Sequence, residues 1–434
     1  ATLFATAELL PRMDFSEGIP PESRTLVVIP TMITGPCAVE DLAEALEVRF
    51  LANRDDNLHF ALLTDFSDAA EEILPEDEGL LGLAREKIAK LNRKYRGEKN
   101  DIFFLFHRPR LWNPRERLWM GYERKRGKLA DLNSFLRGGP KERFSCIVGD
   151  TGVLTNVRYI ITLDTDTRLP RDSARRFAAA MAHPLNRARH DPSRGRVVEG
   201  HGILQPRVAA ILPGDGRSRY AKLCGSEPGV DPYTRVVSDV YQDLFGEGSF
   251  IGKGIYDLDA FETALGGRLP ENLILSHDLL EGCYARAGLL SDVQLYEEYP
   301  STYGADVNRR RRWIRGDWQI LLWLRRRPAL LAQAQVRYLN ARYRLDYTRS
   351  EAALLTELEF EQGKLSLVEA WKPTPGKGSG EAAFPNLTFL QLLFGFRSVE
   401  ELDYAFPDCY VGDSAWGLLE ALFPRKHSDV WPVN

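Results

Sequence analysis

Residues 159–167 read Tyr-Ile-Ile-Thr-Leu-Asp-Thr-Asp-Thr, an apolar run that passes directly into two closely spaced aspartates. The run of apolar and β-branched residues over 159–163 predicts a buried strand. Asp164 and Asp166 follow that strand at its carboxyl end. Open α/β sheets bind their ligands beyond the carboxyl ends of the strands. This stretch therefore predicts a fold class and, within it, the position of a site.

Apolar runs and helical periods alternate upstream of this stretch. Three runs predict strands and two stretches predict helices: strands at 25–33 (TLVVIPTMI), 58–63 (LHFALL) and 101–107 (DIFFLFH), helices at 39–52 and 78–95. Repeated strand–helix–strand order predicts a right-handed, doubly wound and mostly parallel sheet with helices on both faces. Asp65 and His107 fall at strand ends, as Asp164 does.

The second half of the chain predicts less regular structure. A helix is expected to begin at residues 170–173 (PRDS), with Ser or Asp as its cap, and to stop near His183. The glycine- and proline-rich residues 200–235 are expected to wrap the active site. Two more helices are expected at 275–288 and 308–324.

Five segments are expected along the chain: a leader at 1–23, the main α/β domain at 24–330, a mainly helical extension at 331–370, a linker at 371–385 and a C-terminal segment at 386–434. The linker prediction rests on WKPTPGKGSGEAAFP, which is rich in proline and glycine. No role is assigned to the last segment.

The composition is that of an ordinary globular protein, with 44% hydrophobic and 27% charged residues and a formal net charge of −4. The five cysteines are widely spaced and form no CxxC pair, which predicts free thiols in a reducing compartment. No signal-peptide pattern and no run of about 20 apolar residues is present, so a soluble chain is expected. Nucleic-acid binding is not expected, because the basic run lacks interleaved aromatic residues and the net charge is negative.

Asp164 and Asp166 are the candidate metal ligands. Two carboxylates two residues apart at a strand end can both reach one cation, and Mg²⁺ or Mn²⁺ prefers oxygen ligands. Such a cation would offset the negative charge that grows on a departing diphosphate. Paired acidic residues are also common on surfaces, so the strand context carries this prediction.

A basic run at 124–128 (RKRGK) lies between Asp65 and the paired aspartates. Arg124 and Lys128 are candidate diphosphate ligands, because cations and free N–H groups at a helix start attract phosphate. A solvated basic loop at the start of a helix is the structural alternative.

Residues 276–282 (SHDLLEG) supply the candidate catalytic base. An inverting sugar transfer needs a carboxylate that takes the proton of the attacking hydroxyl, and Asp278 is assigned that role. Glu281 is a supporting or alternative base, and His277 either tunes Asp278 or contacts the acceptor. An ordinary aspartate at a helix start is the competing interpretation.

Residues 309–318 (RRRRWIRGDW) join a basic run to two tryptophans. Arg312 is a candidate diphosphate ligand, and Trp313 a candidate apolar floor under a sugar ring. Trp318 is placed near the acceptor. A solvated or membrane-contacting charge run and buried indoles are the structural alternatives.

Four glycines within residues 246–254 (GEGSFIGKG) permit close backbone approach to a ligand, and Gly248 is assigned to the acceptor side. The spacing excludes a Walker-type phosphate loop.

These motifs, in this order, resemble a processive family 2-type glycosyltransferase with a GT-A fold. Three longer strings narrow the resemblance to the synthase domain of cyclic β-1,2-glucan synthase: GILQPRV at 202–208, DPYTRVVSDVYQDLFGEGSFIGKGIYDLDAF at 231–261 and LSHDLLEGCYARAGLLSDV at 275–293. The resemblance covers about residues 24–324. It implies UDP-glucose as the donor, a divalent metal, inversion at the anomeric carbon and a β-1,2-linked glucan product.

By position, the resemblance implies a role for each motif. Asp65 would contact the uridine, Asp164 and Asp166 the ribose-diphosphate and the metal, and Asp278 would be the general base. Arg312 and Trp313 would occupy the Arg-Trp of the QxxRW motif, although Arg309 stands where that motif has glutamine.

The resemblance also implies a location and an acceptor. The family works at the cytoplasmic face of the bacterial inner membrane, and its acceptor is a β-1,2-glucan or a protein-linked chain. Two alternatives stay open: a related β-glycosyltransferase with another sugar or linkage, and a nucleotide-sugar-binding domain that is inactive without its membrane segments.

Overall fold

The computed structural model describes most of the chain, in these ranges: 9–95, 100–211, 218, 220, 242, 246–269, 271–272, 277–298, 300–325, 341–346, 355–361, 364–370, 381–384, 388–393, 397–407 and 409–423. Two compact units are present, Ala1–Ile320 and Leu321–Asn434. Each is described by itself. Among the described helices, none is both long enough and apolar enough to cross a membrane.

An eight-stranded mixed sheet forms the centre of the first unit, in the order β12-β10-β11-β7-β1-β2-β3-β6. Its strands are β1 (Thr25–Ile33), β2 (Leu58–Phe66), β3 (Phe103–His107), β6 (Cys146–Val148), β7 (Tyr159–Thr162), β10 (Ile203–Ala210), β11 (Gly254–Asp257) and β12 (Ala287–Glu297). Parallel pairing joins β7, β1, β2 and β3. The carboxyl ends of these four strands therefore share one edge.

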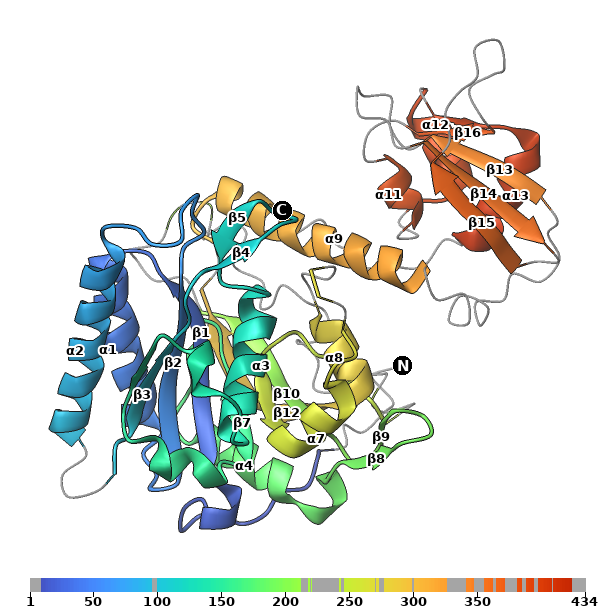
Figure 1. Cartoon of the computed structure of the whole chain (residues 1–434). Coiled ribbons are helices and arrows are strands. Elements are labelled where there is room, and N and C mark those ends of the chain that lie inside the picture. The colour runs from blue at the N-terminus through green and yellow to red at the C-terminus, as the bar shows by residue number, and fades with distance from the viewer. Residues whose placement is uncertain are drawn as a thin grey trace. The chain divides into compact units, whose positions relative to one another are not determined.

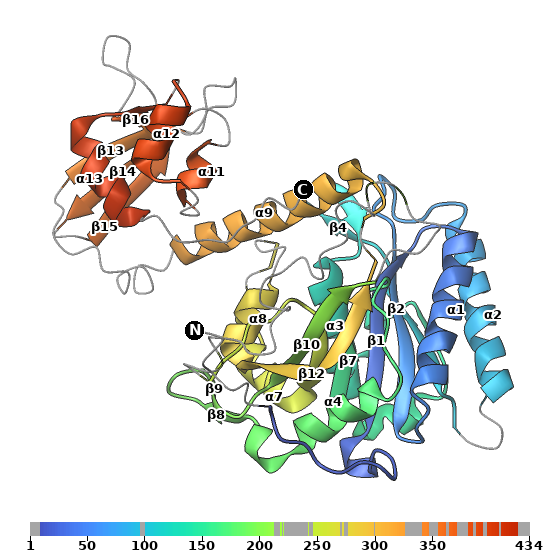
Figure 2. The same cartoon turned by 180° about the vertical axis from the view of Figure 1, so that it is seen from behind.

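Helices cover both faces of this sheet (Figures 1 and 2). They are α1 (Pro36–Ala52), α2 (Asp77–Tyr95), α3 (Arg124–Leu136), α4 (Ser173–Ala182), α7 (Leu258–Leu265) and α8 (Asp278–Ala285). A further helix, α9 (Tyr303–Arg325), begins in this unit and does not cover a face of the sheet. The described residues of the unit also form two small hairpins and four 3₁₀ turns: β4 (Leu111–Asn113) with β5 (Leu118–Met120), β8 (Arg189–Asp191) with β9 (Arg196–Glu199), and turns at Pro21–Ser23, Lys141–Arg143, Thr151–Asn156 and Pro184–Asn186.

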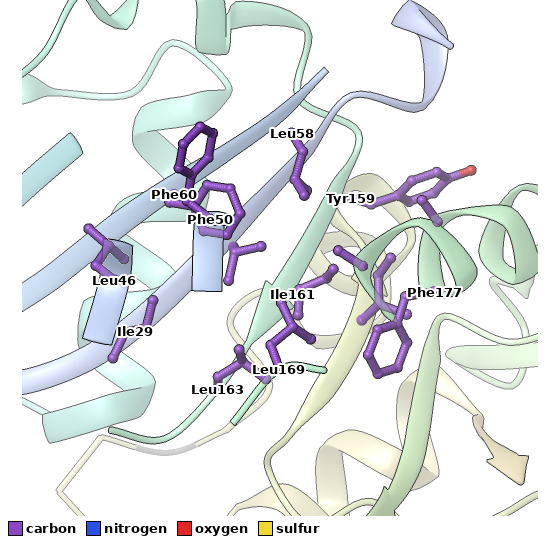
Figure 3. Close-up of a cluster of buried hydrophobic side chains, with 14 of the residues drawn as sticks. Ile29, Leu46, Phe50, Leu58, Phe60, Tyr159, Ile161, Leu163, Leu169 and Phe177 are labelled. Carbon is purple, nitrogen blue, oxygen red and sulfur yellow. The ribbon is translucent and has the colours of Figure 1, made fainter. Parts of the chain in front are cut away.

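Alternation along the strands builds a core on each side of the sheet. Val27 and Ile29 of β1 belong to the core that α1, α2 and α4 cover, whereas Leu26 and Val28 belong to the core under α3, α7 and α8. Figure 3 shows part of the first core, where Phe50 lies beside Phe60. The two-residue period of a strand sends successive side chains to opposite faces, so a sheet buried on both faces is apolar throughout.

The predicted mostly parallel sheet with helices on both faces is confirmed. Strand β11 runs antiparallel to both β7 and β10, and β6 runs antiparallel to β3. Local periodicity predicts that a segment forms a strand, but not whether it pairs parallel or antiparallel with its neighbours.

Three element predictions in the second half need correction. Residues 203–210 form the buried strand β10 and not a wrapping loop, while most of 212–241 lies outside the described residues. The helix expected at 275–288 ends at Ala285, because Arg286 takes a left-handed conformation and β12 begins at Ala287. The predicted cap Asp172 lies before α4 but makes no side-chain capping bond.

The second unit contains a five-stranded sheet in the order β15-β14-β13-β16-β17. Its strands are β13 (Ala341–Asp346), β14 (Leu355–Glu361), β15 (Lys364–Ala370), β16 (Ala382–Ala383) and β17 (Tyr410–Val411), and its helices are α11 (Thr388–Leu393), α12 (Val399–Ala405) and α13 (Asp413–Leu422). A capping box between Ser398 and Glu401 begins α12.

The mainly helical extension predicted for 331–370 is therefore wrong, since its described residues are the strands β13 to β15. In β14, Leu358 and Phe360 alternate with glutamates, which is the two-residue period of a strand. The predicted linker also ends earlier than expected, because Ala382 and Ala383 pair with β13 and β17. Its residues 371–380 lie outside the described residues.

Candidate active site

The loop that carries Asp164 and Asp166 follows β7 at the shared carboxyl edge of the sheet. Arg49 of α1 binds the main chain of this loop. Its Nη2 donates to the carbonyl oxygens of Thr165 and Thr167 at 2.8 Å each. Burial lowers the pKa of Arg49 to about 10, although the charge of Asp166 opposes this. A buried guanidinium thus fixes the backbone of the acidic loop.

Two lysines bind Asp164. The Lys125 Nζ lies 2.7 Å from Oδ1, and the Lys253 Nζ lies 3.2 Å from Oδ2. Burial favours the neutral acid, but these two ammonium charges outweigh it and hold the pKa of Asp164 at about 2. Asp164 is therefore an anion at neutral pH, and each of its oxygens faces a cation.

Asp166 and Glu297 complete an acidic group with Asp164. The carboxylate oxygens of the three residues lie within 4.8 Å of one another. Glu297 is the last residue of β12 and accepts a hydrogen bond of 2.9 Å from Thr167 Oγ1. Burial raises the pKa of Asp166, and the neighbouring Glu297 and Asp164 raise it further. Three clustered carboxylates are a donor set that fits Mg²⁺ or Mn²⁺.

Asp278 lies beside this group. A Cβ atom on Gly252 would be 2.7 Å from Asp278 Oδ1, so the two are in close contact. The carbonyl oxygen of Gly252 accepts a bond of 2.8 Å from Lys125 Nζ, the same nitrogen that binds Asp164. An unbroken series of close contacts therefore runs from Asp164 through Lys125 and Gly252 to Asp278. The predicted convergence of these aspartates on one edge of the sheet is present.

His277 and Glu281 pair with each other behind Asp278. His277 Nε2 lies 3.4 Å from Glu281 Oε1, and both side chains are buried. Burial raises the pKa of Glu281 and the charge of Asp278 adds to this, whereas His277 opposes it. Because α8 starts at Asp278, Glu281 lies one turn of helix further on, and its buried carboxyl group packs behind the candidate base.

Asp65 forms a separate, closed ion cluster. Arg108 binds both of its oxygens, with Nε at 2.9 Å from Oδ1 and Nη2 at 3.0 Å from Oδ2. Lys128 Nζ lies 2.9 Å from Oδ2 and donates to the carbonyl oxygen of Thr31 at 2.6 Å. Burial would raise the pKa of Asp65, but the charges of Lys128 and Arg108 prevail and lower it.

The basic run divides in a way that the sequence did not predict. Lys125 faces Asp164, while Lys128 is buried against Asp65 and the exposed Arg124 pairs with Asp68 at 2.7 Å. The run forms the first turns of α3, where Arg124 and Lys128 stand four residues apart on one face of the helix and Lys125 faces another direction. Arg124 and Lys128 each pair with an aspartate in this structure, and their role as diphosphate ligands stays a prediction.

Arg312 and Trp313 lie on the exposed part of α9. Trp313 stacks with Arg309, whose guanidinium carbon is 5.1 Å from the ring centroid. Trp318 is half-buried on the same helix. Among the described residues, no hydrogen bond or ion pair joins Arg312 to Asp164, Asp166 or Asp278, and the donor contacts predicted for Arg312 and Trp313 stay predictions.

Gly248 is not the glycine that approaches the candidate base. Its N–H donates to the carbonyl oxygen of Ala287 at 2.7 Å, which anchors the glycine-rich loop to the start of β12. Gly252 has a φ of +84° and contacts Asp278. Close approach of this loop to a ligand stays a prediction, while Gly252 is the glycine of the run that packs against Asp278.

Comparison with known proteins assigns the chain. No family model matches the sequence. A curated protein of Rhizobium meliloti (strain 1021), "Cyclic beta-(1,2)-glucan synthase NdvB", is 45% identical over 324 residues, which is 74% of this chain and 11% of that protein. Over this stretch the chain is homologous to a cyclic β-1,2-glucan synthase. It spans about a tenth of the length of the curated relative it matches.

Three charged residues that the motif analysis did not assign individually complete the acidic group: Lys125, Lys253 and Glu297. Lys125 and Lys253 stand inside the quoted runs RKRGK and GEGSFIGKG, but the motifs alone do not show which residue of each run faces Asp164. Glu297 belongs to no motif, and only the pairing of β12 with β10 brings it to the acidic loop.

Proposed function

We propose that this chain is a glycosyltransferase that transfers glucose from UDP-glucose, with inversion, to a growing β-1,2-glucan. The observation that carries the proposal is the placement of Asp164, Asp166 and Asp278 along one series of contacts through Lys125 and Gly252. The printed name of the curated relative supports glucan synthesis. A mostly parallel sheet with acidic residues at its carboxyl edge is consistent with a GT-A fold.

Asp278 is the general base in this proposal. Its carboxylate is half-buried and lies beside Gly252, where a sugar hydroxyl can reach it. An inverting displacement places the attacking hydroxyl opposite the departing diphosphate, so the base and the diphosphate ligands flank one sugar. Glu281 and His277 lie behind Asp278 and keep its environment closed.

Asp164 and Asp166 would hold a divalent cation, Mg²⁺ or Mn²⁺, because clustered carboxylate oxygens are the ligands such ions prefer. When bound, the cation supplies positive charge to the leaving diphosphate. Lys125 supplies a second, permanent positive charge at the same place, since its ammonium lies on Asp164.

The remaining predicted residues are proposed to act outside this group. Asp65, held by Arg108 and Lys128, would shape the uridine end of the site from the neighbouring strand β2. Arg312 and Trp313 on α9 would contact the donor once it is bound. By analogy with the family, the acceptor is a β-1,2-glucan or protein-linked chain at the cytoplasmic face of the inner membrane.

The proposal is tested by incubating the whole chain with UDP-glucose, short β-1,2-linked gluco-oligosaccharides and Mn²⁺ or Mg²⁺. UDP release, and NMR of the product linkage and anomeric configuration, are measured. We expect metal-dependent UDP release and a β-1,2-linked product. Asp278→Asn should lower the rate by about 10²–10⁴-fold. The exposed Asp259→Asn on α7 is the matched control.

Three results would overturn parts of the proposal. Full activity of Asp278→Asn removes Asp278 as the base. Preference for UDP-N-acetylglucosamine in a donor panel replaces glucose as the donor sugar. Calorimetric binding of UDP with no turnover of any donor leaves a binding domain in place of an enzyme.

A further inference from the structure

Lys253 lies at the centre of the acidic group. Its ammonium is 3.2 Å from Asp164 Oδ2 and also binds Glu297 Oε1. The side chain is almost fully buried, with 9% of the residue exposed. A buried ammonium needs anionic partners, and Lys253 finds them in two of the three clustered carboxylates.

The strand register accounts for this position. Gly254 of β11 pairs with Thr162 of β7 in antiparallel fashion, so Lys253 stands next to the residues that follow β7. The acidic loop is also tied to β12, because Arg168 N donates to the carbonyl oxygen of Tyr296 at 2.7 Å. Three different strands thus bring Lys253, Asp164 and Glu297 together.

Charge balance limits what can share this place. Asp164, Asp166 and Glu297 carry three negative charges, and Lys125 and Lys253 carry two positive ones. A divalent cation added to this set would change the net charge of the group from negative to positive. At a separation of about 4 Å, repulsion between an ammonium and a metal ion is a matter of several kcal/mol in a partly buried site. Lys253 competes most directly with such a cation, because its ammonium binds two of the three carboxylates, whereas Lys125 binds Asp164 alone and is also held by the carbonyl oxygen of Gly252.

We propose that Lys253 fills the metal position in the free protein and is displaced when the divalent cation binds, with Glu297 as a third carboxylate ligand of that cation. This inference rests on the proposed function, since it concerns the metal that the transfer reaction uses. The released ammonium then becomes available to the diphosphate of the donor. Binding of the metal therefore raises the affinity for the donor, and binding of the donor raises the affinity for the metal.

The first test measures Mn²⁺ binding to the whole chain by electron paramagnetic resonance, with no sugar nucleotide present. Lys253→Met should bind Mn²⁺ at least about fivefold more tightly, because it removes the competing charge. Glu297→Gln should bind it at least about tenfold more weakly, because it removes a ligand. Lys87→Met, which loses an exposed lysine paired with Glu40 on α1, should match the wild type. Unchanged or weaker binding by Lys253→Met, or unchanged binding by Glu297→Gln, overturns the proposal.

A second measurement needs no variant and so does not depend on how the variants fold. The wild-type chain is treated with an amine-acetylating reagent with and without Mn²⁺, and acetylation of each lysine is followed by peptide mass spectrometry. Displacement predicts that Lys253 reacts at least about threefold faster with Mn²⁺, while Lys87 is unaffected. Equal or slower reaction of Lys253 contradicts displacement.

Both measurements are independent of turnover. A chain that binds Mn²⁺ with these variant effects but transfers no sugar would refute the proposed function and leave this inference intact. A chain that transfers glucose but shows none of these effects would support the proposed function and refute this inference.

Discussion

The ammonium group of Lys125 lies 2.7 Å from the Oδ1 atom of Asp164. Its second partner, the carbonyl oxygen of Gly252, belongs to the segment that contacts Asp278. One side chain on α3 therefore joins the candidate metal ligands to the candidate base. Because α3 lies on one face of the sheet and the acidic loop at its edge, this lysine also fixes the helix relative to the site.

Lys125→Met should lower the affinity for UDP in the presence of Mn²⁺ by about tenfold or more, the usual effect of losing a charge-assisted hydrogen bond. Isothermal titration calorimetry measures this. Arg124→Met is the matched control, because the exposed Arg124 pairs with Asp68 and not with the acidic group. We expect it to stay within about twofold of the wild type. A larger loss of UDP affinity in the Arg124 variant than in the Lys125 variant would support the diphosphate-binding role that the sequence predicts for Arg124.

Gly252→Ala should lower the rate of UDP release, because it displaces the candidate base, and should leave the affinity for UDP unchanged. A Cβ at this position would lie 2.7 Å from Asp278 Oδ1 and would push the carboxylate away. Displacement by about 1 Å lowers rates by about a hundredfold, so UDP release should fall by that order while UDP affinity holds. Gly267→Ala is the matched control, since Gly267 also has a left-handed φ of +69° but has nothing within 4 Å of its Cβ position. Equal activity of the two variants would mean that Asp278 does not need its present position.

Arg108→Met should destabilise the fold strongly. Arg108 and Asp65 are both almost fully buried, and removing one partner of a buried ion pair costs about 3–5 kcal/mol. Urea unfolding followed by circular dichroism gives the change in the free energy of unfolding. Lys87→Met, at an exposed ion pair, should change it by less than about 1 kcal/mol. Similar losses at the two positions would show that the Asp65 cluster is not a structural anchor.

Acidification should destabilise the fold through His59. Burial, with a further contribution from Arg24, lowers the pKa of His59 to about 4 in the folded chain. The unfolded state, with a pKa near the ordinary value of about 6.5, binds the proton first, so stability falls as the pH drops from about 6.5 to about 4. Between pH 7 and pH 5 this contribution is about 2 kcal/mol.

His59→Leu removes that proton-binding group and should flatten the pH dependence of the urea midpoint by the corresponding amount. Part of the slope should remain, because burial also lowers the pKa of His107 and His201 to about 4. Parallel curves for the variant and the wild type over pH 5–7 would contradict the assignment.

The strands nearest the site were predictable because their signal is local. Residues 25–33, 58–63 and 159–163 are apolar runs bounded by turns, and the corresponding strands β1, β2 and β7 begin at the predicted residues. The placement of Asp164 after β7 follows from that alone. The direction of β11 depends on its pairing with β7, which lies far away in the chain, so no local period predicts it. The strands within 341–370 pair with their neighbours in the chain, and the two-residue period of β14 is a local signal that the helical prediction overlooked.

The candidate site was predictable to the level of segments but not of single side chains. The motif around Asp278 pointed to the right helix start, and Gly252 stood inside the quoted glycine-rich run. Which lysine of 124–128 faces Asp164 depends on the rotation of α3, and Glu297 reaches the site only through the register of β12. Rotation and register are tertiary quantities, so a motif cannot supply them.

The hold of Arg49 on the acidic loop has an evolutionary consequence. Since the carbonyl oxygens of Thr165 and Thr167 face the guanidinium inside the fold, they are not free to act as ligands at the surface of the loop. A ligand at this loop can use the side chains of Asp164 and Asp166 but not these two carbonyl oxygens, and a substitution of either side chain leaves the hold of Arg49 on the main chain in place. Related enzymes could therefore diverge in cation preference or donor affinity without rebuilding the scaffold.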